Sequence, residues 1–267
     1  MANEFHGPVS NRKVNKMKFD CVDKPVTKYG RKYLSWKEWD LDAFAVLDKH
    51  KETDFFANVK KSKTDFPLNS QVLEIGFGNG SFLAYGSKRG WKMYGTEVNM
   101  ELVERAKQKG YQAFLTPNLV SFPNKHFNLV VAFDVLEHLP ENELFDFLLE
   151  IKRVLQDNGI FIARFPNGDS PFARFLQYGD SSHVTIIGSL KAKYYAKMLG
   201  VNLVYIGAEA QPILAGWTYF AHRIVAVPVK YLMNLFLNFI FRPRDHVVFT
   251  SPNLVLVFKV KKPATAV

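Results

Sequence analysis

Short apolar runs alternate with amphipathic stretches along most of the chain. Seven runs have the length and composition of buried strands, namely residues 71–75, 91–97, 111–115, 127–133, 159–165, 201–206 and 253–260. Helical periodicity separates them, at residues 80–88, 100–109, 141–155 and 189–199. This alternation predicts a doubly wound α/β domain with a seven-stranded, mostly parallel sheet, covering about residues 66–262.

The segment before this domain, residues 1–65, has a different character. Its first 35 residues are weakly periodic and carry eight lysines and arginines, which indicates a basic arm. From residue 36 to about 58, apolar side chains recur at steps of three and four, which predicts a helix. Because this segment precedes the first strand, we expect it to serve as a lid.

A long insertion, residues 208–251, separates the last two strands. Within it, residues 229–241 form an apolar helical pattern with a narrow polar stripe of Lys230, Asn234 and Asn238. No uncharged apolar run of about 20 residues is present, so we do not expect a spanning helix. The pattern leaves three interpretations: a lid over a substrate, a subunit contact, or a helix in a membrane interface with Arg223, Arg242 and Arg244 near headgroups.

Composition excludes several classes of protein. Hydrophobic residues make up 48% and charged residues 22% of the 267, which excludes wholesale disorder. Cys21 is the single cysteine, so an intrachain disulfide and a cysteine-rich zinc site are excluded. The polar first residues predict no signal peptide, and hence a cytoplasmic protein. The formal charge of +10 favours anionic partners, including phospholipid headgroups. The chain lacks a basic–aromatic motif for specific nucleic-acid binding.

The most specific local pattern is a glycine turn after the first strand. Gly76, Gly78 and Gly80 follow a buried strand and precede a helix, so the backbone can pass close under a ligand. A dinucleotide fingerprint would require a glycine where Ser81 stands. Glu74, two residues before the first glycine, would repel a pyrophosphate but suits an ammonium or a sulfonium.

Glu97 ends the second strand, about 17 residues after Gly80. A carboxylate there can accept hydrogen bonds from both hydroxyls of a ribose. With these two features and the segment Phe133-Asp-Val-Leu-Glu137-His138-Leu-Pro140, the sequence resembles the class I S-adenosylmethionine-dependent methyltransferases. The resemblance covers about residues 71–168 and the last strand, and it is greatest to the glycan, lipopolysaccharide-cluster and ubiquinone-type small-molecule branch.

The resemblance implies a cofactor, S-adenosylmethionine, and a role for each residue around it. Glu74 and the three glycines would cradle the methionyl part, and Glu97 would hold the ribose. Phe133 and Asp134 would line the methionyl side through their backbone. Because Pro117 lacks an N–H, Asn118 and the amide of Leu119 are the candidates for adenine.

Methyl transfer to a hydroxyl usually needs a base, and three residues qualify. His138 follows the fourth strand, while Asp180 and His183 lie in the loop after the fifth, so all three belong to one edge of the sheet. We predict His183 as general base, Asp180 as its orienting residue and His138 as second candidate. No metal ligand is assigned. Nevertheless, Glu137 and His138 can form part of a metal site or brace the next helix, and Asp180 and His183 can share a cation or form an Asx-turn with a surface histidine.

Together these patterns predict an enzyme that O-methylates a sugar hydroxyl in a glycan or lipid-linked saccharide, at the cytoplasmic face of a membrane. Methylation of a prenylated quinone or another lipid is the alternative that the same pattern allows. Methylation of RNA is a further alternative, and the formal charge of +10 is the one feature that favours it. A cofactor-binding protein without turnover is the non-enzymatic alternative.

Overall fold

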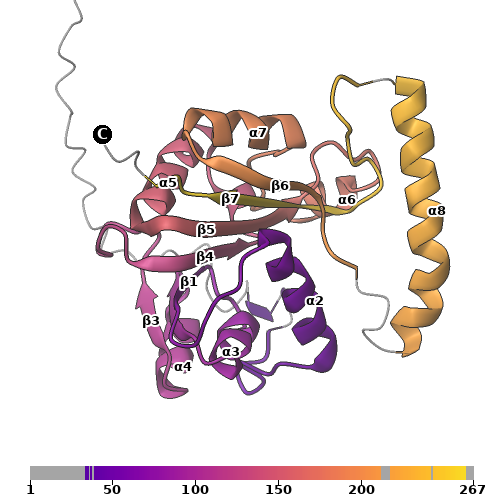
Figure 1. The fold of residues 1–267 in the computed structure, drawn as a ribbon. Coiled ribbons are helices and arrows are strands. Elements are labelled where there is room, and N and C mark those ends of the chain that lie inside the picture. The colour runs from indigo at the N-terminus through magenta and orange to yellow at the C-terminus, as the bar shows by residue number, and fades with distance from the viewer. Residues whose placement is uncertain (1–33, 36, 38, 212–216, 242, 263–267) are drawn as a thin grey trace, which may run out of the picture.

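A computed structural model describes residues 34–35, 37, 39–211, 217–241 and 243–262. Its centre is a seven-stranded sheet with the order β3-β2-β1-β4-β5-β7-β6 (Figure 1). The strands are β1 (Gln71–Ile75), β2 (Lys92–Glu97), β3 (Gln112–Leu115), β4 (Phe127–Phe133), β5 (Leu155–Pro166), β6 (Asn202–Ala208) and β7 (Asn253–Lys259). Strands β1 to β5 pair in parallel, and β7 is antiparallel to both β5 and β6. The predicted seven-stranded, mostly parallel sheet is confirmed.

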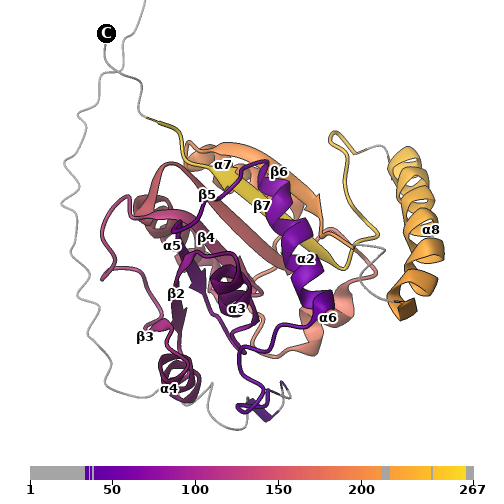
Figure 2. The same cartoon turned by 60° about the horizontal axis from the view of Figure 1, so that its bottom comes forward.

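Helices cover both faces of this sheet (Figures 1 and 2). On one face lie α2 (Lys49–Val59), α3 (Ser81–Lys88) and α4 (Met100–Gln108). On the other lie α5 (Glu141–Val154) and α7 (Ser189–Met198). Short helices η2 (Lys60–Ser62), η3 (Leu136–His138) and α6 (Arg174–Gly179) complete the described elements, with the long α8 (Trp217–Phe241) at one end.

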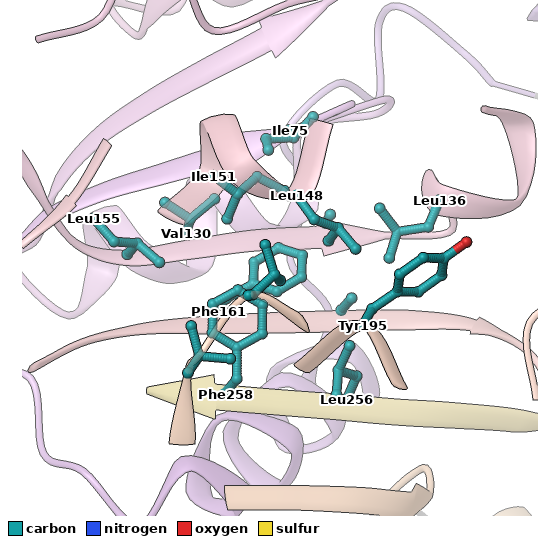
Figure 3. Packing of buried hydrophobic residues seen from close by; sticks show 14 of the residues in the cluster. Ile75, Val130, Leu136, Leu148, Ile151, Leu155, Phe161, Tyr195, Leu256 and Phe258 are labelled. Atoms are coloured by element: carbon teal, nitrogen blue, oxygen red, sulfur yellow. The ribbon is translucent and has the colours of Figure 1, made fainter. Parts of the chain in front are cut away.

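The core beneath α5 and α7 is built from alternate strand residues and the inner helix faces (Figure 3). Phe161 of β5 and Phe258 of β7 are fully buried, with ring centroids 4.9 Å apart. Leu148 and Ile151 of α5 close the layer from above. Burial of aromatic rings at close packing stabilises the strand order that brings the carboxyl ends of β1, β4 and β5 together.

Several elements differ from the prediction. The predicted helix over residues 36–58 begins only at Lys49, where Asp48 caps it by accepting a hydrogen bond from the amide of Lys51. Before it the chain turns, with Ala45 at φ 63°. Residues 1–33, most of the predicted basic arm, lie outside the described residues. Helix α6 was not predicted, and β5 begins four residues earlier than expected.

Helix α8 is longer than the predicted residues 229–241. It extends back to Trp217 through Pro228, a residue that ends most helices. Its stretch Phe220–Phe241 has a mean hydropathy of 1.7, and by length and composition it could cross a membrane, with only 6% of the stretch buried in the protein. The sequence did not predict this, because Arg223 and Lys230 interrupt the uncharged run.

Replacing Phe161 tests the core. Phe161→Ala should lower the free energy of unfolding by about 3–5 kcal/mol, because it removes a fully buried ring and leaves a cavity. Urea denaturation followed by circular dichroism measures the change. Phe175→Ala is the matched control, since that ring is 69% exposed and its loss should change stability little. An equal effect of both substitutions would contradict this account of the core.

Candidate active site

The loops that carry the predicted functional residues meet at one edge of the sheet. They are the turn after β1, the end of β2, and the loops after β4 and β5. The carboxyl ends of parallel neighbours lie on the same side, so residues far apart in sequence come together there. Val135, in the loop after β4, contacts the glycine turn: a Cβ on Gly76 would lie 2.7 Å from its side chain.

The glycine turn has the backbone that only glycine adopts readily. Gly76, Gly78 and Gly80 have φ of 63°, 50° and 73°. The amide of Gly76 donates to the carbonyl of Thr96 in β2, at 2.8 Å. Helix α3 begins directly afterwards, so its first amides point toward the space above the turn. The predicted strand–turn–helix arrangement is present.

The Glu97 carboxylate is placed against this turn by backbone hydrogen bonds. It accepts from the amides of Gly78 at 3.0 Å, Val98 at 2.8 Å and Asn99 at 3.2 Å. Burial raises its pKa, and the three backbone hydrogen bonds oppose that rise. Glu97 therefore joins the end of β2 to the turn after β1 and stands where a ligand on that turn would meet it.

Glu74 adds a second buried carboxyl beside the turn. Burial raises its pKa well above the usual range, and the nearby Glu97 charge raises it further. Its Oε2 is buried and has no hydrogen-bond partner among the described residues. Two buried acids at one turn favour a ligand that brings positive charge.

The segment before α2 covers the same turn. A Cβ on Gly78 would lie 2.8 Å from the Trp39 ring, and one on Gly80 would lie 2.5 Å from the Phe44 ring. The amide of Ala45 donates to the carbonyl of Asn79 at 2.8 Å. The described part of the N-terminal segment thus lies where a lid over a ligand at the turn would lie.

Asn118 and Leu119, the predicted adenine residues, belong to the loop after β3. The Asn118 side chain accepts a hydrogen bond from the amide of Val120 at 3.2 Å. Leu119 is buried, and its carbonyl accepts from Arg153 at 2.8 Å. This loop therefore has a fixed shape near the Glu97 end of β2, to whose carbonyl the Thr116 amide donates.

Phe133 and Asp134 lie between the glycine turn and the histidines. The Phe133 ring stacks on Phe55 of α2, with centroids 5.7 Å apart. Asp134 has φ 57°, and its carboxylate forms an ion pair with Arg164 of β5. Burial of Arg164 lowers its pKa, but the Asp134 charge more than compensates, so the guanidinium stays protonated.

The loop after β5 brings His138 and His183 into contact. The amides of Val184 and Thr185 donate to the carbonyl of Glu137 at 2.9 and 3.0 Å. These bonds place the two imidazole rings with their centroids 4.7 Å apart. The sequence placed both residues at this edge of the sheet, and the structure brings them together.

Ser182 connects Asp180 to His138, a contact that the positions of these residues in the sequence did not suggest. Ser182 donates its amide and its hydroxyl to the Asp180 carboxylate, and its Oγ is 3.0 Å from His138 Nδ1. His183 Nε2 is 3.7 Å from Asp180 Oδ2, longer than a hydrogen bond. The other Asp180 oxygen accepts from Lys37 at 3.0 Å.

The charges of this group follow from its contacts. Burial alone would raise the pKa of Asp180, but the hydrogen bonds from Ser182 and Lys37 lower it to about 2. Burial and the neighbouring His183 lower the pKa of His138. Asp180 is thus a carboxylate near neutral pH, and His138 is biased toward the neutral imidazole.

Glu137 lies at the centre of this group, and the sequence analysis gave it no catalytic role. Its side chain is 1% exposed, and Oε1 is 3.9 Å from His183 Nε2. Neither carboxylate oxygen has a hydrogen-bond partner among the described residues, nor does His183 Nδ1. Burial raises the pKa of Glu137 well above its usual range.

In the sequence, the adjacent His138 was the one feature that indicated a functional role for Glu137. Lys37 and Ser182 were also missed.

The loop after β5 also lines a hollow of about 350 Å³. Its polar lining includes Asn167, Asp169, Arg174 and Gln177. The rings of Phe172, Phe175 and Tyr178 are exposed beside it. This hollow offers an acceptor both hydrogen-bonding groups and aromatic faces.

Comparisons with known proteins agree with this arrangement. Residues 73–163, from β1 to β5, match the family model described as a methyltransferase domain. No curated protein matches the sequence.

Solved structures share the fold at low sequence identity. An S-adenosylmethionine-dependent methyltransferase from Archaeoglobus fulgidus is 18% identical with a TM-score of 0.61, over 86% of this chain and 99% of that chain. A putative methyltransferase from Bacillus halodurans is 14% identical with a TM-score of 0.53, over 79% and 100% of the two chains. The [4+2]-cyclase SpnF is 13% identical with a TM-score of 0.52, over 78% and 80%.

These structural likenesses show the fold, and the SpnF example shows that the fold alone does not set the reaction. The family match covers the segment that holds the glycine turn, Glu97 and the loop after β4. Residues 73–163 thus match a methyltransferase domain, and the fold around them is shared with S-adenosylmethionine-dependent methyltransferases of known structure.

Proposed function

We propose that this protein is an S-adenosylmethionine-dependent methyltransferase that acts on a hydroxyl group of a saccharide. The observation that supports this most is the group of Glu137, His138 and His183. Glu137 and His138 follow Val135 by two and three residues, and Val135 contacts the glycine turn. In the reaction, the acceptor oxygen forms a bond to the methyl carbon as the carbon–sulfur bond breaks. The electron pair returns to sulfur, and the hydroxyl proton must leave.

The cofactor roles follow the predicted assignment. The Glu97 carboxylate would exchange part of its backbone hydrogen bonding for the ribose hydroxyls. Glu74 and the three glycines would face the methionyl part, where a sulfonium offsets the cost of two buried acids. Phe133 and Asp134 would line its other side, with Asn118 and the Leu119 amide toward adenine.

Removing the Glu97 carboxylate should weaken cofactor binding. Glu97→Gln keeps the size of the side chain but removes its charge and one strong acceptor, so we expect the Kd for S-adenosylmethionine to rise tenfold or more, about 1.4 kcal/mol. Calorimetric titration measures it. Glu104→Ala, an exposed acid on α4, should bind as the unmodified protein does. Unchanged binding by Glu97→Gln would contradict the assignment.

His183 is the proposed general base when the histidine group holds no ion. Its Nδ1 is buried and has no partner among the described residues, so it would accept the proton of an acceptor that reaches this buried position. The imidazolium that forms would stand beside Glu137 and Asp180, whose charges stabilise it. His138, held through Ser182, is the second candidate.

Substitution of His183 should separate chemistry from cofactor binding. His183→Ala should lower the rate of labelled methyl transfer about 100-fold or more, the usual contribution of a general base. Its Kd for S-adenosylmethionine should stay within about twofold. Equal losses of transfer and binding, or loss of neither, would contradict the role of His183.

Helix α8 supports a membrane-bound acceptor because its polar side chains face the protein and its apolar side chains face outward. Asn234 and Asn238 of the predicted polar stripe face the protein, where their side chains bond the backbone of Val247 and Phe249. The opposite face is apolar and exposed. Its largest exposed side chains include Val229, Leu232, Phe236, Phe239, Ile240 and Phe241. An apolar exposed face with a bonded polar stripe is typical of a helix in contact with lipid.

Residues 243–252, the segment that returns from α8 to β7, link α8 to the hollow. Asn167 donates to the carbonyls of Val248 and Ser251, and Ser170 donates to that of Phe249. A saccharide carried on a lipid would therefore have its lipid at α8 and its sugar near the hollow. We propose a peripheral location at the cytoplasmic face of the membrane, with Arg244 near headgroups; Arg242 lies outside the described residues.

A lipid acceptor such as a prenylated quinone is the second candidate, favoured by the exposed apolar face of α8. Labelled methyl transfer to extracted lipids but not to saccharide fractions would select it. Transfer to saccharide fractions would select the first proposal.

Charges on the exposed face of α8 should abolish membrane binding. The double substitution Phe236→Asp, Phe239→Asp should reduce sedimentation with anionic phospholipid vesicles at least tenfold, because burying each carboxylate in lipid is costly. Val120→Asp places one carboxylate on an exposed apolar site far from α8 along the chain and should have no effect. Vesicle binding that survives the double substitution would contradict this role of α8.

A further inference from the structure

The buried carboxylate of Glu137 forms no hydrogen bond with the part of the chain that the structure describes. Both of its oxygens are inaccessible and lack a hydrogen-bond partner among the described residues. A buried carboxylate in such a state is costly unless a cation or a proton accompanies it. The two cations whose charges act on Glu137 have other partners, since Arg164 pairs with Asp134 and Lys37 donates to Asp180.

Two nitrogen ligands face this carboxylate. Glu137, His138 and His183 each offer one ligand atom, and these atoms lie within 4.8 Å of one another. Ligands bound to one ion at about 2.0–2.2 Å would lie about 3–4 Å apart, so a small contraction closes the set. The hydrogen bonds from Val184 and Thr185 to the Glu137 carbonyl hold the two loops in that position.

The surrounding hydrogen bonds suit ligation as well. His138 Nδ1 is bonded to Ser182, which in turn donates to Asp180. This leaves Nε2 of His138 as its ligand atom, and an outer carboxylate orienting a ligating imidazole is the usual second layer of a metal site. On the other ring, Nε2 of His183 is the nitrogen nearest Glu137.

We propose that Glu137, His138 and His183 bind a divalent transition-metal ion. Two imidazoles and one carboxylate favour zinc or manganese over magnesium and leave coordination positions for water or an acceptor hydroxyl. The meaning of this site for catalysis rests on the proposed function. In the loaded protein His183 would be a ligand, and the ion would lower the pKa of a bound acceptor hydroxyl so that its proton passes to water in place of a free imidazole base.

Calorimetric titration of the chelator-treated full chain with ZnCl₂ and with MnCl₂ tests the site. We expect one-site binding with micromolar or lower Kd for at least one of the two metals. Glu137→Gln and His183→Ala should each weaken it at least tenfold, whereas His222→Ala, which removes an exposed imidazole from α8, should not. S-adenosylmethionine binding by each variant shows that it is folded.

Two outcomes would overturn the metal site: no binding of either metal, or equal binding by the substituted and unmodified proteins. Methyl transfer is measured separately, with and without chelator. Transfer that continues in chelator without metal binding overturns the metal site and retains the proposed function. Metal binding without transfer to any saccharide or lipid fraction retains the site and overturns the proposed function.

Discussion

The turn after β1 and the end of β2, where the cofactor is proposed to bind, depend on one carboxylate in contact with three backbone amides. Glu97 accepts from Gly78 across the sheet and from Val98 and Asn99 in its own loop. The turn after β1 and the start of α4 are therefore held by the same side chain. Under the proposed function, a ribose at this place would share Glu97 with the backbone, which would link cofactor binding to the shape of the turn.

The sequence predicted those features that local pattern determines. Strand runs, the glycine turn and Glu97 each follow from a few neighbouring residues, and the sheet order then places them together. It could not predict that the Val184 and Thr185 amides bond the Glu137 carbonyl, because no local signal encodes that long-range contact. For this reason Asp180 and His183 were paired by spacing, while Glu137 was given no catalytic role.

The orientation of helix α8 is a second feature that the sequence could not predict. The polar stripe was visible in the sequence, but its direction was not. Asn234 and Asn238 provide hydrogen-bond donors and acceptors to the backbone of residues 247–249. Among the described residues, no backbone–backbone hydrogen bond is formed by this segment. Satisfying that backbone turns the apolar side chains outward, so the return segment determines which face of α8 meets its surroundings.

Buried acids are concentrated at the active edge of a chain whose formal charge is +10. Glu74 and Glu97 flank the turn, and Glu137 lies beyond Val135. Burial favours their protonated forms, and a bound cation favours the ionised ones. Under the two proposals, a sulfonium at the first pair and a metal ion at the third acid would each release protons on binding. The electrostatic preference of this edge is thus opposite to that of the whole surface, and it selects positively charged ligands within a basic protein.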